Sequence, residues 1–301
     1  MKPVQIIAEI GSNHNGSVDI AKQYIDASKA SGADWVKLQT LTKPQLMSPK
    51  TLIDGAVQPY PIWNIFNCNP LSDQAHAELF SYAQQQDIAL FSAPFYLEAV
   101  DLLERMQVSQ YKIASGDIAF FPLLDKVGAT KKRVILSTGA SDLLDVEKAV
   151  RRLTDAGCPE IVLLHCVSNY PPVWDEINLK AMTTLQTEFG TAVGISDHTP
   201  GALLPIAAVA MGASYIEKHV TFDRRLNGPD HPFAMTFAEF SDMIAQIRIL
   251  EKALGNGIKV PTTSETEKQW RIRRGTYDPI SLEPSTAENA IWLRPDYRMK
   301  G

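Results

Sequence analysis

The chain has 301 residues, of which 45% are hydrophobic and 21% are charged. This composition is typical of a folded globular protein and excludes a disordered chain, a collagen-like repeat and a disulfide-rich miniprotein. The 29 basic and 34 acidic residues give a net charge of −5, which argues against nucleic acid or an anionic membrane as a partner.

The sequence also lacks the marks of a secreted or membrane protein. The first ten residues are too short an apolar stretch for a signal peptide, and the most apolar later segment, 203–216, is shorter than the roughly 20 residues that a membrane span needs. The three cysteines, Cys68, Cys158 and Cys166, show no CxxC spacing. We therefore expect a cytoplasmic protein without a disulfide framework or a zinc knuckle.

Short β-rich runs alternate with amphipathic stretches through the first 254 residues. In chain order, the predicted strands are 4–10, 35–39, 88–92, 110–113, 134–137, 161–165, 192–195 and 215–219. The predicted helices include 19–31, 73–86, 97–106, 143–156, 201–211 and 237–254. Eight strands with intervening helices predict an α/β fold, a (β/α)8 TIM barrel over residues 1–254, with a long proline-rich insertion at 41–70.

Residues 255–301 do not continue this alternation. They are richer in Thr, Arg and Pro and show no clear helical period. A segment of this size is too small to bury a core of its own, so we interpret it as a linker and a short C-terminal extension.

Polar side chains gather at the ends of the predicted strands. They are Glu9, Lys37, Gln39, Lys112, Ser115, His165, Ser168, Asn169, Tyr170, Ser196, Asp197, His198, Glu217 and His219. Because the carboxyl ends of barrel strands meet at the rim where active sites are built, we expect these side chains to converge. A soluble core rarely accepts so many ionisable groups unless they are paired or take part in chemistry.

Each of these residues also has a structural interpretation. A single lysine or glutamate at a strand end can be half of an ion pair, and a single histidine can be a hydrogen-bonded core residue. Asp197 is either part of the rim or the cap of a helix that begins near Pro200. Cys166 is interpreted as a packing residue. The concentration of polar groups on one rim favours a functional site.

The residue types at this rim point to a class of reaction. Two imidazoles at the ends of adjacent strands, His198 and His219, can share a divalent ion and leave positions open for water and substrate oxygens. Two lysines facing one cavity suit a phosphate or a carboxylate, and a glutamate beside them can position water or move a proton. The residues alone therefore predict a metal-assisted reaction on a small anionic substrate.

These residues stand within longer motifs that follow one another along residues 4–240. The motifs are IAEIGSNHNG at 7–16, GADWVKLQT at 32–40, YKIASGD at 111–117, STG at 137–139, LHC at 164–166 leading to YP at 170–171, GISDHT at 194–199, IEKH at 216–219 and GPDH at 228–231. In this order they resemble the sialic acid synthase (N-acetylneuraminate synthase) family.

The resemblance implies a transferase that condenses phosphoenolpyruvate with the open-chain aldehyde of an N-acylhexosamine. The products would be phosphate and a nine-carbon 2-keto acid sugar, a nonulosonic acid used in surface polysaccharides. His198 and His219 would bind a divalent metal, Mn²⁺ or Mg²⁺, that polarises the aldehyde, and Glu9 would act on the attacking water.

The resemblance also assigns the substrate contacts. Phosphate and carboxylate would be held by Lys37, Lys112, Ser115 and Ser196, with Ser168 or Asn169. The sugar would be faced by Gln39, Tyr170, Asp117 and Asp230. The family's fold is a TIM barrel followed by an antifreeze-like domain, of which residues 255–301 carry only a short, early part. Arg294, within ENAIWLRP at 288–295, would reach the sugar site of a partner subunit in a homodimer.

Three positions depart from the family's pattern and keep alternatives open. Ala93 replaces a common threonine, Val57 stands where many members have asparagine, and Asp117 replaces a common glutamate. These changes predict an altered sugar preference or weaker binding, and they motivate one alternative, a non-catalytic or regulatory sugar-binding homologue. The other is a related barrel aldolase or lyase in which Lys112 forms a Schiff base, against which the two-histidine site argues.

Overall fold

The computed structural model describes residues 3–65 and 69–299, and it divides into two compact units, 1–253 and 254–301. The boundary predicted from the sequence lies one residue later, after 254. Cys68 lies outside the described residues, whereas Cys158 and Cys166 are buried free thiols.

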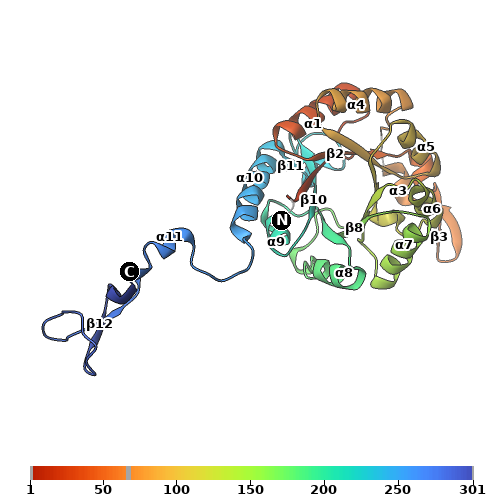
Figure 1. The fold of residues 1–301 in the computed structure, drawn as a ribbon. Coiled ribbons are helices and arrows are strands. Elements are labelled where there is room, and N and C mark those ends of the chain that lie inside the picture. Colours follow the sequence, from red (N-terminus) through yellow and green to blue (C-terminus); the bar gives the residue numbers. More distant parts are fainter. Residues whose placement is uncertain (1–2, 66–68, 300–301) are drawn as a thin grey trace. The chain divides into compact units, whose positions relative to one another are not determined.

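Eight parallel strands form a closed barrel in the first unit (Figure 1). They are β1 (Gln5–Glu9), β2 (Trp35–Thr40), β5 (Ala89–Pro94), β6 (Gln110–Ile113), β7 (Arg133–Ser137), β8 (Ile161–Cys166), β9 (Ala192–Asp197) and β10 (Tyr215–Thr221). Each strand pairs with the next in this order, and β10 pairs with β1, which closes the ring. A short strand, β11 (Met235–Thr236), pairs with the end of β10. The predicted (β/α)8 TIM barrel is confirmed.

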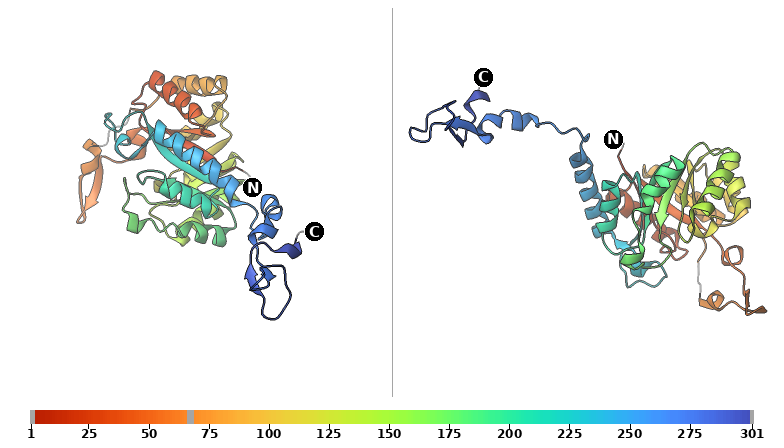
Figure 2. Two further views of the ribbon diagram at one scale, coloured as in Figure 1. Left: turned by 90° about the vertical axis from the view of Figure 1, so that its left-hand side faces the viewer. Right: turned by 90° about the horizontal axis from the view of Figure 1, so that it is seen from below.

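Helices cover the outside of the barrel, and α10 lies along its outer face (Figure 2). The main ones are α1 (Val18–Ala30), α4 (Asp73–Gln85), α5 (Leu97–Arg105), α6 (Phe121–Ala129), α7 (Leu143–Asp155), α8 (Ala181–Phe189), α9 (Leu203–Ala210) and α10 (Phe237–Leu254). The local sequence determines where several of these helices begin. The Ser17 side chain caps α1, and Asp142 and Asp145 form a capping box at the start of α7. In the described part of the chain, no helix is both long and apolar enough to cross a bilayer.

The inside of the barrel is apolar at one level and polar at the next. Its buried apolar cluster consists of Ile7, Phe91, Ile135, Val162, Leu164 and Tyr215, with Trp35 and Ala192 packed against it. Because alternate residues of a strand face the same side, Glu9 follows Ile7 on the inner face, and Glu217 and His219 follow Tyr215. The apolar cluster therefore supports a layer of polar side chains at the carboxyl ends of the strands.

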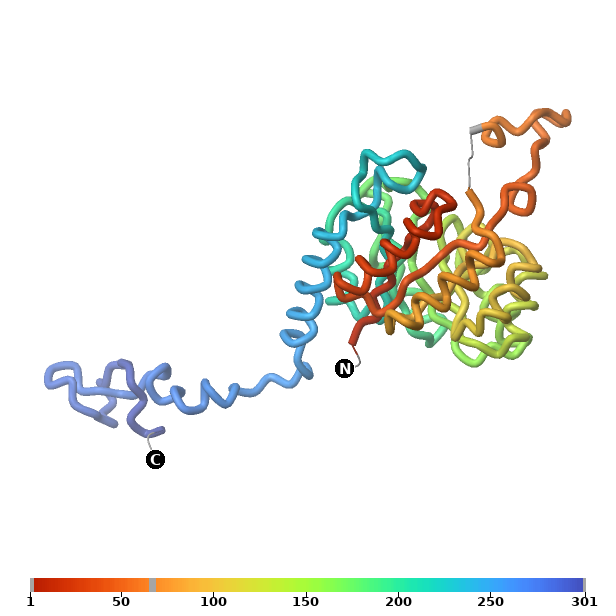
Figure 3. The backbone as a smooth tube through the Cα atoms, turned by 90° about the horizontal axis from the view of Figure 1, so that it is seen from above, coloured from red at the N-terminus to blue at the C-terminus, as the bar shows by residue number. Residues whose placement is uncertain are grey.

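The insertion between β2 and α4 leaves the barrel as an arm (Figure 3). It contains α2 (Lys43–Leu46), the antiparallel strands β3 (Lys50–Ile53) and β4 (Ala56–Pro59), and α3 (Pro61–Ile65). Asp54 and Gly55 connect the two strands with φ values of 51° and 77°, as a tight two-residue hairpin turn requires. Val57 lies on β4 and is 70% exposed.

The second unit is small and mostly exposed. It holds the single-turn helices α11 (Thr263–Thr266) and α12 (Gln269–Ile272) and the antiparallel pair β12 (Gly275–Tyr277) and β13 (Ile291–Leu293). The rings of Tyr277 and Tyr297 meet edge to face with centroids 5.7 Å apart. Arg294 follows β13 and is exposed. The likeness of this segment to an antifreeze-like domain stays a prediction.

Candidate active site

Two lysines and two glutamates share the polar layer at the barrel mouth. Lys37 Nζ lies 2.6 Å from Glu9 Oε2 and 3.8 Å from Glu217 Oε2, and Lys112 Nζ lies 3.8 Å from Glu217 Oε1. None of the four residues is more than 4% exposed. The barrel register explains the first contact, since Glu9 and Lys37 are partners across β1 and β2. Charged side chains from four strands thus meet in a water-excluded layer.

This alternation of charge controls how the groups ionise. Burial alone lowers the pKa of Lys37, but the carboxylates of Glu217 and Glu9 outweigh it and raise that pKa above its usual value. Burial raises the pKa of Glu217, yet Lys112 and Lys37 reverse the shift and lower it. The pKa of Lys112 is lowered by burial, which Glu217 does not offset. Lys37 and Glu217 are therefore charged at neutral pH.

Neutral donors hold the two carboxylates in place. Gln39 Nε2 donates to Glu9 Oε1 over 2.8 Å, and Ser196 Oγ donates to Glu217 Oε1 over the same distance. Lys112 Nζ donates to Ser137 Oγ over 2.5 Å. Ser137, at the end of β7, was not among the predicted site residues.

The two histidines lie side by side next to this layer. Their ring centroids are 5.3 Å apart, and both residues are less than 9% exposed. His219 Nδ1 is buried without a hydrogen bond and lies 3.9 Å from Asp230 Oδ2. Burial, with added repulsion from His219 and nearby lysines, holds the pKa of His198 well below its usual value, so its ring is neutral at pH 7. Neutral imidazole is the form that binds metals.

In the part of the chain that the structure describes, no third protein ligand accompanies these two rings. Among residues 3–65 and 69–299, the structure holds no cluster of three or more His, Cys, Asp or Glu side chains arranged to bind a metal ion. A cation held by His198 and His219 would therefore complete its coordination with water or substrate oxygens.

Two aromatic rings form a wall against the histidines. Tyr170 meets His198 edge to face with centroids 4.5 Å apart. Phe233 lies 5.0 Å from His219 and 5.7 Å from His198, again edge to face. On the inner side, Cys166 Sγ lies 4.0 Å from His198 Nδ1. Sequence reasoning singled out Tyr170 but missed Phe233, which follows the GPDH motif by two residues and carries no polar group to mark it.

The loop after β1 closes against His219. Ser12 donates to Asp230 Oδ2 from its backbone N and its hydroxyl, over 2.8 and 2.9 Å. Gly11 has a φ of 58°, and a Cβ there would collide with Asp230 and lie 3.0 Å from His219 Cε1. Glycine is thus required by both backbone conformation and close approach.

A second group of predicted residues surrounds Gly139. Ser115 Oγ accepts from the Gly139 N over 2.9 Å, and a Cβ on Gly139 would collide with Ser168 Oγ. Asp117 is half-buried, and its Oδ2 makes no hydrogen bond. Burial raises the pKa of Asp117 to about 6, although Lys112 acts in the opposite direction.

Three further residues named from the sequence have other surroundings. Asn169 is exposed and donates to Glu176 Oε2 over 3.4 Å. Arg294, in the second unit, is exposed. The interpretation of Asp197 as a helix cap is wrong: α9 begins at Leu203 after Ala202, while Asp197 lies 2.6 Å from Lys218 Nζ on the outer side of the barrel.

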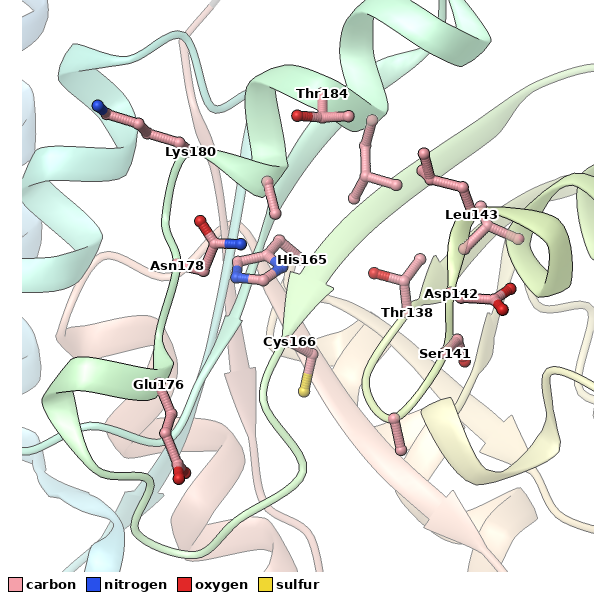
Figure 4. Close-up of a pocket in the computed structure, with 14 residues that line it drawn as sticks. Thr138, Ser141, Asp142, Leu143, His165, Cys166, Glu176, Asn178, Lys180 and Thr184 are labelled. Atoms are coloured by element: carbon pink, nitrogen blue, oxygen red, sulfur yellow. The ribbon is translucent and has the colours of Figure 1, made fainter.

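A cavity of about 640 Å³ adjoins the site between the β7–α7 and β8–α8 segments (Figure 4). His165 and Cys166 both border it. Because the two residues are adjacent on β8, their side chains face opposite sides of the strand. His165 faces outward, and its Nε2 lies 2.7 Å from the Ile177 carbonyl oxygen. His165 is thus separated from the polar layer, despite its place at a strand end.

Comparison with known proteins gives consistent matches. Residues 24–259 match the model of the NeuB family. The chain is 41% identical to N,N'-diacetyllegionaminic acid synthase of Campylobacter jejuni, over 91% of this chain and 84% of that protein. It is 39% identical to pseudaminic acid synthase of Helicobacter pylori, over 98% and 89%. The crystal structure of N-acetylneuraminic acid synthetase from Leptospira borgpetersenii, in complex with citrate, superposes with a TM-score of 0.81 at 32% identity, covering 89% and 90%.

Proposed function

This chain belongs to the NeuB family, and we propose that it is a nonulosonic acid synthase, a transferase that condenses phosphoenolpyruvate with an N-acylhexosamine. Relatives named legionaminic and pseudaminic acid synthases match it at 38–41% identity over nearly its whole length. The observation that carries the proposal is the buried layer of Lys37, Glu9, Glu217 and Lys112 beside the paired imidazoles of His198 and His219.

In this proposal the lysines bind phosphoenolpyruvate. Lys37 and Lys112 would hold its phosphate and carboxylate, with the hydroxyls of Ser115, Ser137 and Ser196 as further donors. Support comes from their contacts, since Glu217 lies between both ammonium groups and Ser137 lies against Lys112. When phosphoenolpyruvate is bound, its negative charges would pair with the two lysines in place of part of the pairing that Glu9 and Glu217 provide without it.

The proposed reaction forms one carbon–carbon bond and breaks one carbon–oxygen bond. The C2–C3 double-bond electrons of phosphoenolpyruvate attack the aldehyde carbon, and the aldehyde oxygen takes up a proton to become a hydroxyl. Water adds at C2 and loses its protons, the C2–O bond to phosphate breaks, and a 2-keto acid and phosphate result. Glu9, held by Lys37 and Gln39, would orient the water and accept its proton.

A divalent cation fits the histidine pair. Two imidazoles, completed by water or substrate oxygens, suit a first-row divalent cation such as Mn²⁺, and the buried Nδ1 of His219, which makes no hydrogen bond, is available as a ligand. Bound there, the cation would polarise the sugar aldehyde as a Lewis acid. Tyr170 and Phe233 would keep both rings in position by their edge-to-face contacts.

The sugar would meet Gln39, Tyr170, Asp117 and Asp230. Asp117 makes this contact testable, because its pKa is raised to about 6 and it gains a proton as the pH falls through that value. A neutral Asp117 is a weaker acceptor for sugar hydroxyls, so KM for the sugar is expected to rise several-fold between pH 7 and pH 5 while kcat changes less. Steady-state kinetics across this range will measure it.

The matched variant is Asp117→Asn, which carries no charge at any pH. Its sugar KM is expected to be high at pH 7 and flat down to pH 5, whereas Asp101→Asn, on the exposed side of α5, should follow the parent enzyme. A flat profile in the parent enzyme contradicts the assignment of Asp117 to the sugar.

The overall function is tested by product formation. The protein is incubated with phosphoenolpyruvate, Mn²⁺ and a panel of N-acylhexosamines, both unphosphorylated and 6-phosphorylated. We expect phosphate release that requires the metal and one of the sugars, with an equal amount of 2-keto acid. No phosphate release with any sugar would overturn the proposal and favour a sugar-binding role.

Homodimerisation and the role of Arg294 remain parts of this proposal. Arg294 is exposed, as a residue that serves a partner subunit would be. Light scattering is expected to give twice the chain's mass. Since phosphoenolpyruvate is a cytoplasmic metabolite, we place the reaction in the cytoplasm, where the free thiols of Cys158 and Cys166 are also stable.

A further inference from the structure

Behind the two histidines, on the outer side of the barrel wall, lies a buried ion pair that the proposed reaction does not use. Lys218 Nζ is 2.6 Å from Asp197 Oδ2, and both side chains are only 1% exposed. The two residues are direct register partners on the parallel strands β9 and β10. The pair therefore links these strands at their carboxyl ends.

The contacts continue past the end of β9. Asp197 Oδ1 accepts from the Thr199 N over 2.8 Å, Asp197 Oδ2 accepts from Thr199 Oγ1 over 3.1 Å, and Lys218 Nζ also donates to the Thr199 carbonyl oxygen. We call Asp197, Thr199 and Lys218 the outer clip. All three residues are 4% exposed or less, so water does not compete for these bonds.

His198 lies in the middle of this arrangement. The paired register of β9 and β10 ends at Asp197 and Lys218, so the next two residues across the strands, His198 and His219, have no ladder pairing to each other. The outer clip holds the residues on both sides of His198 instead. His198 itself turns to the inner side, where its ring is 5.3 Å from that of His219.

We propose that the outer clip is a positioning device that sets the spacing of the two imidazoles for their cation. This inference rests on the proposed function, because it takes His198 and His219 as the metal ligands. Its members touch neither metal nor substrate: they act through the backbone of residues 197–199. A purely structural ion pair in the same place would stabilise the fold without affecting the metal.

Binding of Mn²⁺ to the purified full-length protein, followed by electron paramagnetic resonance, separates these two roles. Asp197→Asn keeps an acceptor for Thr199 but removes the charge opposite Lys218. It is expected to weaken Mn²⁺ binding about tenfold or more, as loss of groups that support metal ligands does. Phosphoenolpyruvate affinity, measured by calorimetry, should stay within about twofold of the parent, because Lys37 and Lys112 are unchanged.

The matched control is Asp34→Asn. Asp34 also pairs with a cation, Arg248 at 2.9 Å, and also accepts from a backbone nitrogen, that of Ile6, but it precedes β2 at the opposite end of the barrel. Both variants are expected to lose thermal stability, and only Asp197→Asn should lose Mn²⁺ affinity. If Asp197→Asn does not fold, Thr199→Val removes a single hydrogen bond of the clip and should still weaken Mn²⁺ binding about threefold.

The outcomes distinguish the role of the outer clip from the existence of the metal site. If the parent protein binds Mn²⁺ and the clip variants bind it equally well, the outer clip has no positioning role. If the parent protein binds phosphoenolpyruvate but no Mn²⁺, the metal site of the proposed function is itself wrong, and the positioning role is overturned with it.

Discussion

Replacement of His219 by glutamine is expected to abolish Mn²⁺ binding and to lower kcat about a thousandfold. The proposed site draws its protein ligands from His198 and His219, and the described part of the chain holds no group of three metal-binding side chains, so removal of His219 would leave His198 alone. Loss of a metal's charge stabilisation costs several kcal/mol in the transition state, which corresponds to about three orders of magnitude in rate. Phosphoenolpyruvate should still bind, since the lysines are untouched. Electron paramagnetic resonance with Mn²⁺ and single-turnover phosphate release will measure the two effects.

The control for this prediction is His76→Gln. His76 is also buried, but it contacts Thr40 Oγ1 and the Ser72 carbonyl oxygen on the outer side of β2, each over 3.0 Å. Its variant should lose stability and keep its Mn²⁺ affinity. A His219→Gln protein that binds Mn²⁺ as tightly as the parent would show that the cation lies elsewhere.

Replacement of Lys37 by methionine is expected to cost about 3–5 kcal/mol of unfolding free energy at pH 7. The substitution leaves Glu9 without its ammonium partner at 2.6 Å and takes one of two cations from Glu217, although both carboxylates stay buried. Removing one partner of a buried ion pair is destabilising on this scale because the remaining charge is uncompensated. Urea denaturation will measure it.

The loss of unfolding free energy caused by Lys37→Met should become smaller as the pH falls. The pKa of Glu217 is lowered in the folded state below its usual 4.5, so its stabilising contribution is complete above about pH 4.5 and is lost as the pH falls through the lower, folded value. Without Lys37 the pKa of Glu217 rises. The difference in unfolding free energy between parent and variant should therefore decrease towards acid pH.

The control here is Lys126→Met, which breaks a solvent-exposed pair with Asp101 at 2.6 Å. It should change the unfolding free energy by less than about 1 kcal/mol at every pH. If Lys37→Met lowered the unfolding free energy no more than this control does, the result would show that water reaches the charged layer, contrary to its burial in the structure.

The barrel itself could be predicted because its signal is repeated eight times. Each strand carries a short run of β-branched or aliphatic residues, and each run is separated from the next by a helical stretch, so an error of two residues at one boundary leaves the count unchanged. The hairpin of β3 and β4 gives only one such signal, and its exposed strands have no buried face to impose a pattern.

The site was only partly predictable from sequence. Lys37 and Glu217 are ionisable residues inside β-rich runs, which makes them conspicuous in any reading of the chain. Ser137 is an ordinary polar residue at the end of its strand. Only its contact with Lys112 on the neighbouring strand gives it a role in the site. For Asp197 the sequence could not show that Lys218 lies directly opposite, since that depends on the register of two strands.

At the carboxyl ends of the barrel strands, one side of the rim is held together by many contacts, whereas the other side is exposed to solvent. The segments at 9–12, 196–199 and 217–230 are tied to one another by the Asp197–Lys218 ion pair, by hydrogen bonds and by a glycine, Gly11, that tolerates no side chain. Tyr170 and Trp174, beyond β8, are each about half exposed. Libraries aimed at new sugar acceptors should therefore vary the residues around 170–174 and leave the three tied segments constant.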